Sequence, residues 1–313
     1  MAIIGLDIGG TKILGAVFND QGQIMDKEKQ PSKADDGFER FMQQVYHVID
    51  ELINRSDESI QGIGIGFPGT IDQNGHVIFA PNLPVEQFDL AGHLADRYHT
   101  KVLVGNDVNL GTYGEYCELD IPYKNVIGLF PGTGLGGGIV INGELYIGQG
   151  SAGELGHIVV RKNGVKCSCG NKGCLESYAS KKGILAYIKK EMKKGRKTVL
   201  KKEAKAGVVK SSQLRKAVED GDVLTIEAID QFKAYLGMGV GIIMNIFNPD
   251  LVIIGGGIVE NFGKELMKDI RKHAKAYTLP GIYENTKLRH SKLGDDTVIY
   301  GGYHLIKSAM STN

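Results

Sequence analysis

The sequence has almost no excess of charge of either sign. Its 37 lysines and arginines stand against 36 aspartates and glutamates, which leaves a formal net charge of +1. Such a balance provides no general attraction to nucleic acid or to anionic lipid. One basic stretch, residues 189–205, is interpreted as a solvated helix face, with a polyanion-binding patch as the alternative. We therefore expect neither nucleic acid nor a membrane as a partner.

Long apolar runs and a secretory signal are also missing. No run approaches the ~18 residues of a membrane-spanning helix, and VGIIMNIF and LVIIGGGIV have the length of buried segments. The start, MAIIGLDIGG, lacks the basic region and long apolar stretch of a signal peptide, so we expect a cytoplasmic protein. Only four cysteines occur in 313 residues, and a chain of this length needs no disulfide for stability. The cysteines need another explanation.

Glycine is abundant instead. The 44 glycines are about twice the average usage of ~7%. They cluster at residues 9–10, 132–138, 255–257 and 301–302, each time beside an apolar, strand-like run. Such clusters indicate places where the backbone turns tightly or approaches something closely.

The pattern of elements indicates two related α/β domains. Residues 1–30 are expected to form three strands, and the apolar spacing from Phe38 to Ile53 predicts an amphipathic helix. Residues 134–147 show the same order of glycine turns and expected strands as residues 9–24, which suggests a duplication. We expect a domain of residues 1–108, completed by a C-terminal helix within 297–313, and a larger domain of residues 109–296. A helical region, roughly residues 180–247, should end before the sequence NPD.

Two glycine loops, DIGGTK and PGTGLGGG, each join two expected strands. Such a turn can point backbone N–H groups into a concavity that binds phosphate, although either loop alone could simply close a hairpin. Gly132, Gly134 and Gly137 also fit the dinucleotide fingerprint, but the hairpin signal after them excludes the helix that this fingerprint requires. Asp7 could hold a Mg²⁺ shell beside the first loop, or could be a turn or cap residue.

Three cysteines lie close together in a short loop downstream of His157. A Cys-x-Cys pair is too close for a relaxed disulfide, and a redox site would need Cys-x-x-Cys at a helix start. Three thiolates and one imidazole are the closed ligand set of structural zinc, and we predict the ligands His157, Cys167, Cys169 and Cys174. Because such a site has no open position, the metal would hold the loop and fix its flanking carboxylates, Glu154 and Glu176. Cys117 is interpreted as a buried small hydrophobe.

The motifs DIGGTK, GTGLGGG, ELGH and CSCGNKGCLES, in this order, resemble the ROK family of sugar kinases and repressors over essentially the whole chain. The resemblance implies the two-lobed, actin-like and hexokinase-like ATPase fold, with duplicated ribonuclease H-like domains and a cleft between the lobes. Within the family the chain is most similar to ATP-dependent bacterial glucokinases. Repressors of the family carry a DNA-binding helix-turn-helix ahead of DIGGTK, and we expect none here because that motif begins at Asp7.

The resemblance also implies roles for individual residues. Asp107 would be the general base and a sugar ligand; taken alone it could equally cap the helix that follows. Sugar hydroxyls would be bound by a set of six further residues: Gly69, Asn82, Asn106, Glu154, His157 and Glu176. ATP and its Mg²⁺ would contact the glycine turns and their neighbours: Asp7, Gly9, Gly10, Thr11, Lys12, Gly132, Thr133, Gly134, Gly136, Gly137, Gly138, Gly256 and Gly257.

The leading hypothesis is transfer of phosphate from ATP to the 6-hydroxyl of a hexose, with glucose as the expected substrate. One alternative is an N-acetylhexosamine kinase acting on N-acetylmannosamine or N-acetylglucosamine. Another is a sugar-sensing regulator that binds ligand without turnover. Relatives in the family also suggest a homo-oligomer, either a dimer or a tetramer.

Overall fold

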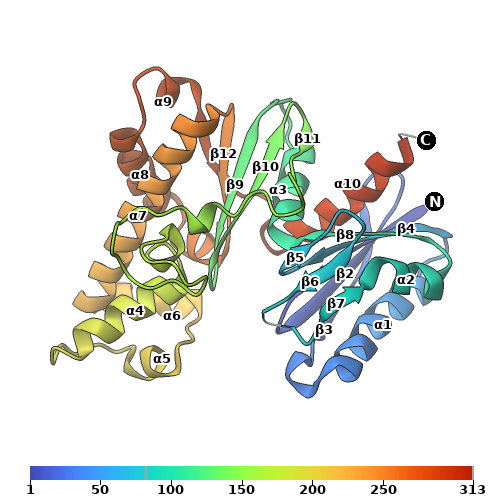
Figure 1. Cartoon of the computed structure of the whole chain (residues 1–313), viewed down its shortest axis with the longest axis horizontal. Coiled ribbons are helices and arrows are strands. Elements are labelled where there is room, and N and C mark those ends of the chain that lie inside the picture. Colours follow the sequence, from blue (N-terminus) through green and yellow to red (C-terminus); the bar gives the residue numbers. More distant parts are fainter. Residues whose placement is uncertain (82, 312–313) are drawn as a thin grey trace. The chain divides into compact units, whose positions relative to one another are not determined.

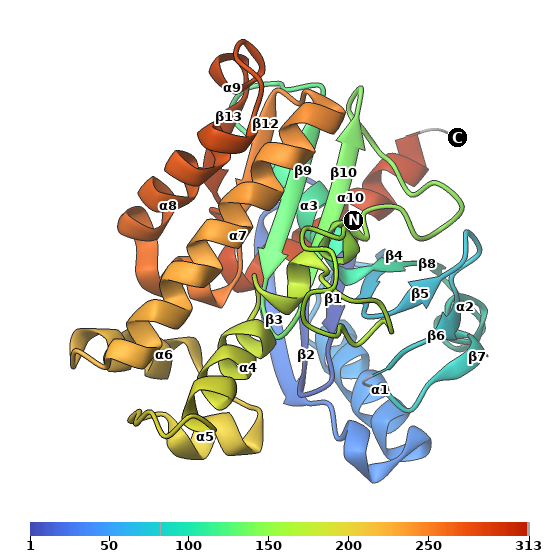
Figure 2. The same ribbon diagram turned by 60° about the vertical axis from the view of Figure 1, so that its left-hand side comes forward.

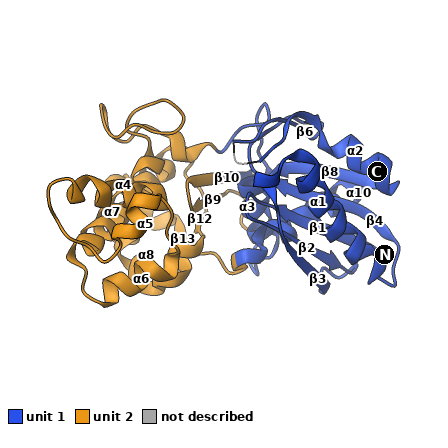
Figure 3. Ribbon diagram, turned by 90° about the horizontal axis from the view of Figure 1, so that it is seen from below, with its two compact units in different colours: residues 1–122, 138–153, 295–313 blue, residues 123–137, 154–294 orange. Residues whose placement is uncertain are grey.

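The computed structural model describes residues 1–81 and 83–311 (Figure 1). The chain divides into two compact units (Figure 3): unit 1 comprises residues 1–122, 138–153 and 295–313, and unit 2 comprises residues 123–137 and 154–294. This division differs from the expected boundary after residue 108, because residues 109–122 and 138–153 belong to unit 1. Helix α3 (Asp107–Cys117) belongs to unit 1 because it packs closely on α10 (Thr297–Ser311). A Cβ atom on Gly301 of α10 would lie 2.0 Å from the carbonyl oxygen of Leu110, a distance that only glycine permits.

Unit 1 is built on a five-stranded sheet with the order β3-β2-β1-β4-β8. Its strands are β1 (Ala2–Ile8), β2 (Lys12–Phe18), β3 (Ile24–Pro31), β4 (Ile60–Phe67) and β8 (Lys101–Asn106). β1 pairs antiparallel with β2 and parallel with β4, and β4 pairs parallel with β8. The carboxyl ends of β1, β4 and β8 therefore meet at one edge of the sheet.

The two faces of this sheet carry different helices, as the period of two in a strand requires. Ile4 and Leu6 of β1 belong to the core that includes α1 (Phe38–Asn54) and α2 (Leu90–Tyr98), whereas Ile3 belongs to the core under α10. Helix α1 confirms the prediction made from its apolar spacing, because its buried side chains recur every three or four residues. Gly5 lets α10 approach β1, since a Cβ there would lie 2.1 Å from the carbonyl oxygen of Ile299.

A second, smaller sheet in unit 1 was not predicted from the sequence. It contains three antiparallel strands, β5 (Thr70–Ile71), β6 (His76–Phe79) and β7 (Glu86–Asp89). These strands are two to four residues long, and such short segments show too few alternations for a pattern to be recognised.

The other five-stranded sheet has the order β11-β10-β9-β12-β13. Its strands are β9 (Val126–Pro131), β10 (Leu135–Ile141), β11 (Glu144–Leu145), β12 (Leu251–Ile254) and β13 (Lys287–His290). β12 is parallel to both β9 and β13. If the five strands of each of these two sheets are numbered 1 to 5 in chain order, both sheets have the spatial order 3-2-1-4-5. This shared order supports the duplication predicted from the glycine turns.

The helices of unit 2 make up most of its remaining structure (Figure 2). They are α4 (Lys181–Met192), α5 (Lys201–Ala206), α6 (Ser211–Glu219), α7 (Val223–Phe247), α8 (Gly257–Tyr277) and α9 (Ile282–Asn285). Short 3₁₀ turns occur at Ala34–Asp36, Leu155–His157, Leu175–Ser177 and Gly294–Asp296. Helix α7 ends where the sequence NPD predicted. Among residues 1–81 and 83–311, no helix is both long and apolar enough to cross a membrane.

Candidate functional site

Two aspartates lie at the edge of unit 1 where its parallel strands end. Asp7 is the penultimate residue of β1 and pairs with Gly66 of β4, which in turn pairs with Gly105 of β8. Asp107 follows two residues after Gly105, as the first residue of α3. The register of the parallel strands therefore brings the two carboxylates to the same edge.

The electrostatics of Asp7 reflect this placement. Its pKa is raised from 3.8 to about 7, first by burial and then by the negative charge of Asp107. The ammonium group of Lys12 opposes this shift, and the carboxylate of Asp295 adds to it. Perturbed carboxylates of this kind are typical of functional sites.

The cap of α3 is not Asp107, so the alternative interpretation of Asp107 as a helix cap is wrong. Asn106 is the N-cap residue, and its Oδ1 accepts hydrogen bonds from the N–H groups of Val108 at 3.0 Å and Asn109 at 3.1 Å. Its Nδ2 donates to the carbonyl oxygen of Gly69 at 3.2 Å. Asn106 rather than Asp107 therefore supplies the side-chain cap of the helix.

Gly69 has a backbone that other residues rarely adopt, with φ at +129°. A Cβ atom there would lie 2.2 Å from the carbonyl oxygen of Phe79, so the position requires glycine for packing as well as for conformation. Asn82, the other sugar-binding residue predicted in this region, lies outside the described residues.

The first glycine turn, residues 9–12, is closed by its own backbone. The N–H of Gly9 donates to the carbonyl oxygen of Lys12 at 2.9 Å. Ser32 secures the turn from outside, because its hydroxyl donates to the carbonyl oxygen of Gly10 at 2.7 Å and its N–H donates to that of Thr11 at 3.2 Å. The Nζ atom of Lys12 pairs with Asp295 at 2.9 Å.

The second glycine turn connects β9 to β10, and the prediction that no helix follows it directly is confirmed. The N–H of Gly132 donates to the carbonyl oxygen of Gly134 at 2.8 Å, while the N–H groups of Lys181 and Lys182, at the start of α4, donate to Gly132 and Thr133. Gly136 and Gly137 lie within β10. Gly138 lies in unit 1, where a Cβ atom would be 2.2 Å from Oγ1 of Thr112.

A third glycine turn lies beside the second. β12 runs parallel to β9, and after Gly255 the chain reaches Gly256 and Gly257 at the start of α8. A Cβ on Gly256 would lie 2.6 Å from the carbonyl oxygen of Pro131, the last residue of β9. Within unit 2, the backbone of two glycine turns and the N-terminus of α8, a helix kinked at Gly263, are therefore close together, an arrangement suited to anions.

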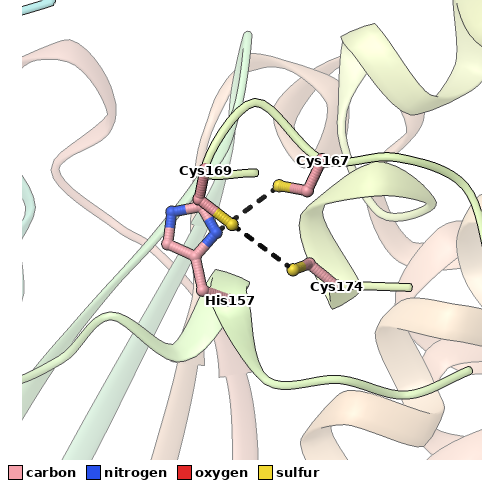
Figure 4. Close-up of side chains that lie close together, drawn as sticks. All are labelled: His157, Cys167, Cys169 and Cys174. Carbon is pink, nitrogen blue, oxygen red and sulfur yellow. Dashed lines mark hydrogen bonds between the residues drawn. The ribbon is translucent and has the colours of Figure 1, made fainter. Parts of the chain in front are cut away.

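The four predicted metal ligands come together in unit 2, where their side chains point toward one another (Figure 4). The candidate ligand atoms of His157, Cys167, Cys169 and Cys174 all lie within 4.8 Å of one another. Sγ of Cys169 is 3.7 Å from Sγ of Cys174, and Sγ of Cys167 is 3.6 Å from Nδ1 of His157. None of these cysteines is in a disulfide.

These distances fit a tetrahedral zinc site. Zn–S bonds of about 2.3 Å separate two sulfurs of a tetrahedron by about 3.8 Å, and a sulfur from a nitrogen by slightly less. Cys167 and Cys174 are buried, and burial raises the pKa of the Cys174 thiol to about 12. A dication would offset the cost of burying such thiolates.

The loop that carries these ligands is shaped by two glycines with positive φ, Gly170 at 95° and Gly173 at 83°. The N–H of Cys167 donates to the carbonyl oxygen of Asn171 at 2.8 Å, which closes the turn that contains Cys169. A Cβ on Gly173 would lie 1.7 Å from the carbonyl oxygen of Arg161. The backbone thus holds the turn in addition to any metal.

His157 presents its two ring nitrogens to different groups. Nδ1 faces Cys167, whereas Nε2 lies 3.7 Å from a carboxylate oxygen of Glu154. One nitrogen is therefore available to a metal, and the other lies beside Glu154, whose side chain is 62% exposed.

Glu176 links the cysteine loop to the second glycine turn. Its Oε2 accepts a hydrogen bond from the N–H of Leu135 at 2.9 Å, and its Oε1 accepts one from the hydroxyl of Ser168 at 3.2 Å. A Cβ on Gly134 would lie 2.3 Å from Oε2. Neither Ser168 nor this link was predicted, because a hydrogen bond across 41 residues leaves no local pattern.

Comparison with known proteins agrees with these motifs. The family model described as "ROK family" matches residues 3–309. The chain belongs to the ROK family.

Among relatives of this ROK protein, the glucokinase of Halalkalibacterium halodurans is 33% identical over 97% of this chain and 94% of its own. A xylose repressor of Caldicellulosiruptor bescii is 31% identical over 99% of this chain and 79% of its own. The structure of a ROK family glucokinase from Streptomyces griseus in complex with glucose and AMPPNP is 28% identical, with a TM-score of 0.82 over 97% of this chain and 99% of that one. The fold is thus that of the hexokinase-like ATPases, and relatives include both sugar kinases and repressors.

Proposed function

We propose that this ROK protein is an ATP-dependent hexose kinase that transfers the γ-phosphoryl group of ATP to the 6-hydroxyl of glucose. The observation that carries the proposal is the pair of carboxylates, Asp7 and Asp107, at the edge of unit 1 where its parallel strands end; we call this the carboxylate edge. Asp107 begins α3, and Asn106 caps that helix. A carboxylate at the carboxyl ends of parallel strands lies where ligands bind in open α/β sheets, and it can accept the proton of a bound hydroxyl. The similarity to glucokinases at 33% identity supports glucose as the substrate.

Asp107 accepts the proton of the attacking hydroxyl and orients its oxygen in line with the phosphoryl group. Phosphoryl transfer depends on positioning and charge stabilisation more than on covalent help, and an oriented base provides the first of these. The remaining N–H of Asn106 donates to a sugar hydroxyl, and its bond to Gly69 fixes the direction of that donor.

In unit 2, Glu154, His157 and Glu176 bind the other hydroxyls of the sugar. Nδ1 of His157 is a zinc ligand in this proposal, which leaves Nε2 for the sugar and fixes the ring orientation. Because Oε1 of Glu176 accepts from Ser168 and Cys167 and Oε2 accepts from the N–H of Leu135, the carboxylate is held in place, while Oε2 keeps a lone pair for a ligand.

The glycine turns bind the phosphates of ATP through their backbone N–H groups, with Lys12 as a cationic partner. When bound, Mg²⁺ would neutralise charge on the β- and γ-phosphates, and Asp7 is the carboxylate placed to hold its water shell. A bound zinc ion would hold the loop and so fix the positions of His157 and Glu176. It would take no part in the reaction, because its four coordination positions are filled by the protein.

The test is a coupled assay of the purified protein with Mg-ATP and a panel of glucose, mannose, fructose, allose, N-acetylmannosamine and N-acetylglucosamine. We expect the highest kcat/KM with glucose. A higher kcat/KM with an N-acetyl sugar would show that the substrate is an N-acetylhexosamine, and the proposed transfer of phosphate from ATP would stand. Sugar binding by calorimetry without turnover on any sugar would establish the regulator alternative, which the similarity to a xylose repressor makes a necessary arm of the test.

A further inference from the structure

Two neighbouring aspartates at the 3₁₀ turn before α10 each pair with a lysine of the β2–β3 hairpin. Asp295 pairs with Lys12 at 2.9 Å, and Asp296 pairs with Lys27 at 2.6 Å. The members of each pair are 283 and 269 residues apart in the sequence.

Stability does not explain the Lys12–Asp295 pair. The Asp295 side chain is 71% exposed and that of Lys12 is 31% exposed. An ion pair so open to water contributes little to stability, because solvent and salt screen it. The ion pair between Asp296 and Lys27 also links the start of α10 to the hairpin, and Asp296 is less exposed, at 29%.

The two pairs differ in where their lysines lie. Lys27 is in the middle of β3, whereas Lys12 closes the first glycine turn and accepts a hydrogen bond from Gly9 through its carbonyl oxygen. Lys12 is the first residue of β2, in which Leu14 pairs with Asp7 of β1, so the pair lies at the edge that carries Asp7. A free lysine side chain has many rotamers, and much of that conformational entropy is lost when its ammonium group is fixed on a ligand.

We propose that Asp295 is a positioning residue for nucleotide binding: it holds the ammonium group of Lys12 at the first glycine turn, ready to meet the phosphate chain. This inference rests on the proposed function, and it adds a residue that no motif of the glycine turns contains. Because 71% of the Asp295 side chain is exposed, it can orient Lys12 without itself occupying the phosphate position.

The charges around Lys12 make this positioning useful. A phosphate chain approaching the carboxylates of Asp7 and Asp107 is repelled by them, and Lys12 counters that repulsion only when its ammonium group is near the turn. If Asp295 mainly competed with phosphate for Lys12, removing its charge would strengthen binding. If it positions Lys12, removing its charge weakens binding. The two readings therefore predict opposite signs.

The experiment compares Asp295→Asn with Asp296→Asn as a matched control, since both variants remove one acid from the same turn and one ion pair to the same hairpin. Dissociation constants are measured by calorimetry for AMPPNP, ADP and adenosine, in the presence of Mg²⁺ and glucose. We expect Asp295→Asn to weaken AMPPNP and ADP about fivefold, the order expected for the loss of one ordered side chain, and to leave adenosine unchanged. Asp296→Asn should stay within about twofold for all three ligands.

Two further variants separate positioning from structure. Asp295→Glu should restore AMPPNP affinity to within about twofold, because it returns a carboxylate to the same side chain. In a Lys12→Met background, Asp295→Asn should cause no further loss, because the group that it positions is gone. Thermal denaturation should show both asparagine variants to be as stable as each other.

Several results would overturn the inference. These are equal nucleotide affinities for the two asparagine variants, tighter binding by Asp295→Asn, or an equal loss for adenosine. If the unaltered protein binds neither AMPPNP nor ADP at millimolar concentration, the proposed function fails together with the inference. If the unaltered protein binds both and Asp295→Asn behaves like Asp296→Asn, the inference alone fails.

Discussion

The carboxylate edge of unit 1 and the cysteine loop of unit 2 hold acidic groups in two different ways. Asp7 and Asp107 are positioned by a strand ladder and by the first turn of a helix, whose hydrogen bonds involve many residues. Glu154 and Glu176 lie at 3₁₀ turns of three residues and depend on side-chain contacts for their orientation. The first pair is fixed by regular backbone, the second by a loop and its ligands.

This difference predicts how each region responds to a single substitution. At the edge of unit 1, a changed side chain should leave the backbone in place, so that chemistry is lost without loss of structure. In the cysteine loop, loss of one ligand should loosen the neighbouring acids, so that binding is lost through structure. The following predictions test this contrast, from the largest expected effect to the smallest.

Asp107→Asn should lower kcat at least about a thousandfold, the order expected for a base that also orients the nucleophile. The fold should not change, because asparagine retains an oxygen where Oδ1 of Asp107 accepts from the N–H of Val108 at 2.9 Å. Glucose affinity measured by calorimetry should stay within about threefold. Asp96→Asn on the exposed side of α2 is the control and should retain full turnover. Substantial activity of Asp107→Asn would place the base elsewhere.

Cys169→Ala should remove the metal and weaken glucose binding by about tenfold or more, because outer contacts of a metal site commonly contribute that much. Metal analysis of the unaltered protein should find about one zinc per chain. Cys117→Ala is the matched control, since Cys117 lies at the end of α3 and outside the ligand cluster, and it should keep both metal and affinity. Full glucose affinity in zinc-free protein would disprove the role of the loop.

Asp7→Asn should stabilise the protein at alkaline pH while removing activity. The raised pKa of Asp7, about 7, means that the folded protein retains a proton that the unfolded chain has released between about pH 4 and pH 7. The unaltered protein therefore loses stability as pH rises through that window, and Asp7→Asn does not. Allowing for solvent screening at a partly exposed strand end, the gain above pH 7 should be about 2 kcal/mol.

The measurement is denaturant unfolding of both proteins in Mg²⁺-free buffer at pH 5 and pH 8. The advantage of Asp7→Asn should be larger at pH 8 than at pH 5. The opposite order would show that the carboxyl group of Asp7 has a lowered pKa in the folded protein.

Much of this structure could be predicted from the sequence, because its signals are local. The spacing in α1, the NPD stop after α7 and the three cysteines near His157 each lie within one short segment. What could not be predicted depends on distant residues. The boundary of unit 1 follows from glycines that let α10 approach α3. Asn106 and Asp107 are both residue types that cap helices, and only the backbone geometry shows that Asn106 is the cap of α3. Glu176 was predicted as a sugar ligand, but its contact with Leu135 was not.

That contact supplies the smallest prediction, which tests whether the second glycine turn and the cysteine loop act together. Gly134→Ala would place a Cβ atom 2.3 Å from Oε2 of Glu176, so that the flexible carboxylate must turn away and lose its bond to the N–H of Leu135. We expect a stability loss of about 1 kcal/mol, the net worth of one such hydrogen bond, together with weaker glucose binding. Gly132→Ala is the control, because among the described residues no atom beyond its chain neighbours lies within 4 Å of the added Cβ, and its stability should change by less than about 0.5 kcal/mol. Equal effects of the two variants on stability and on glucose affinity would mean that Glu176 is held by the cysteine loop alone.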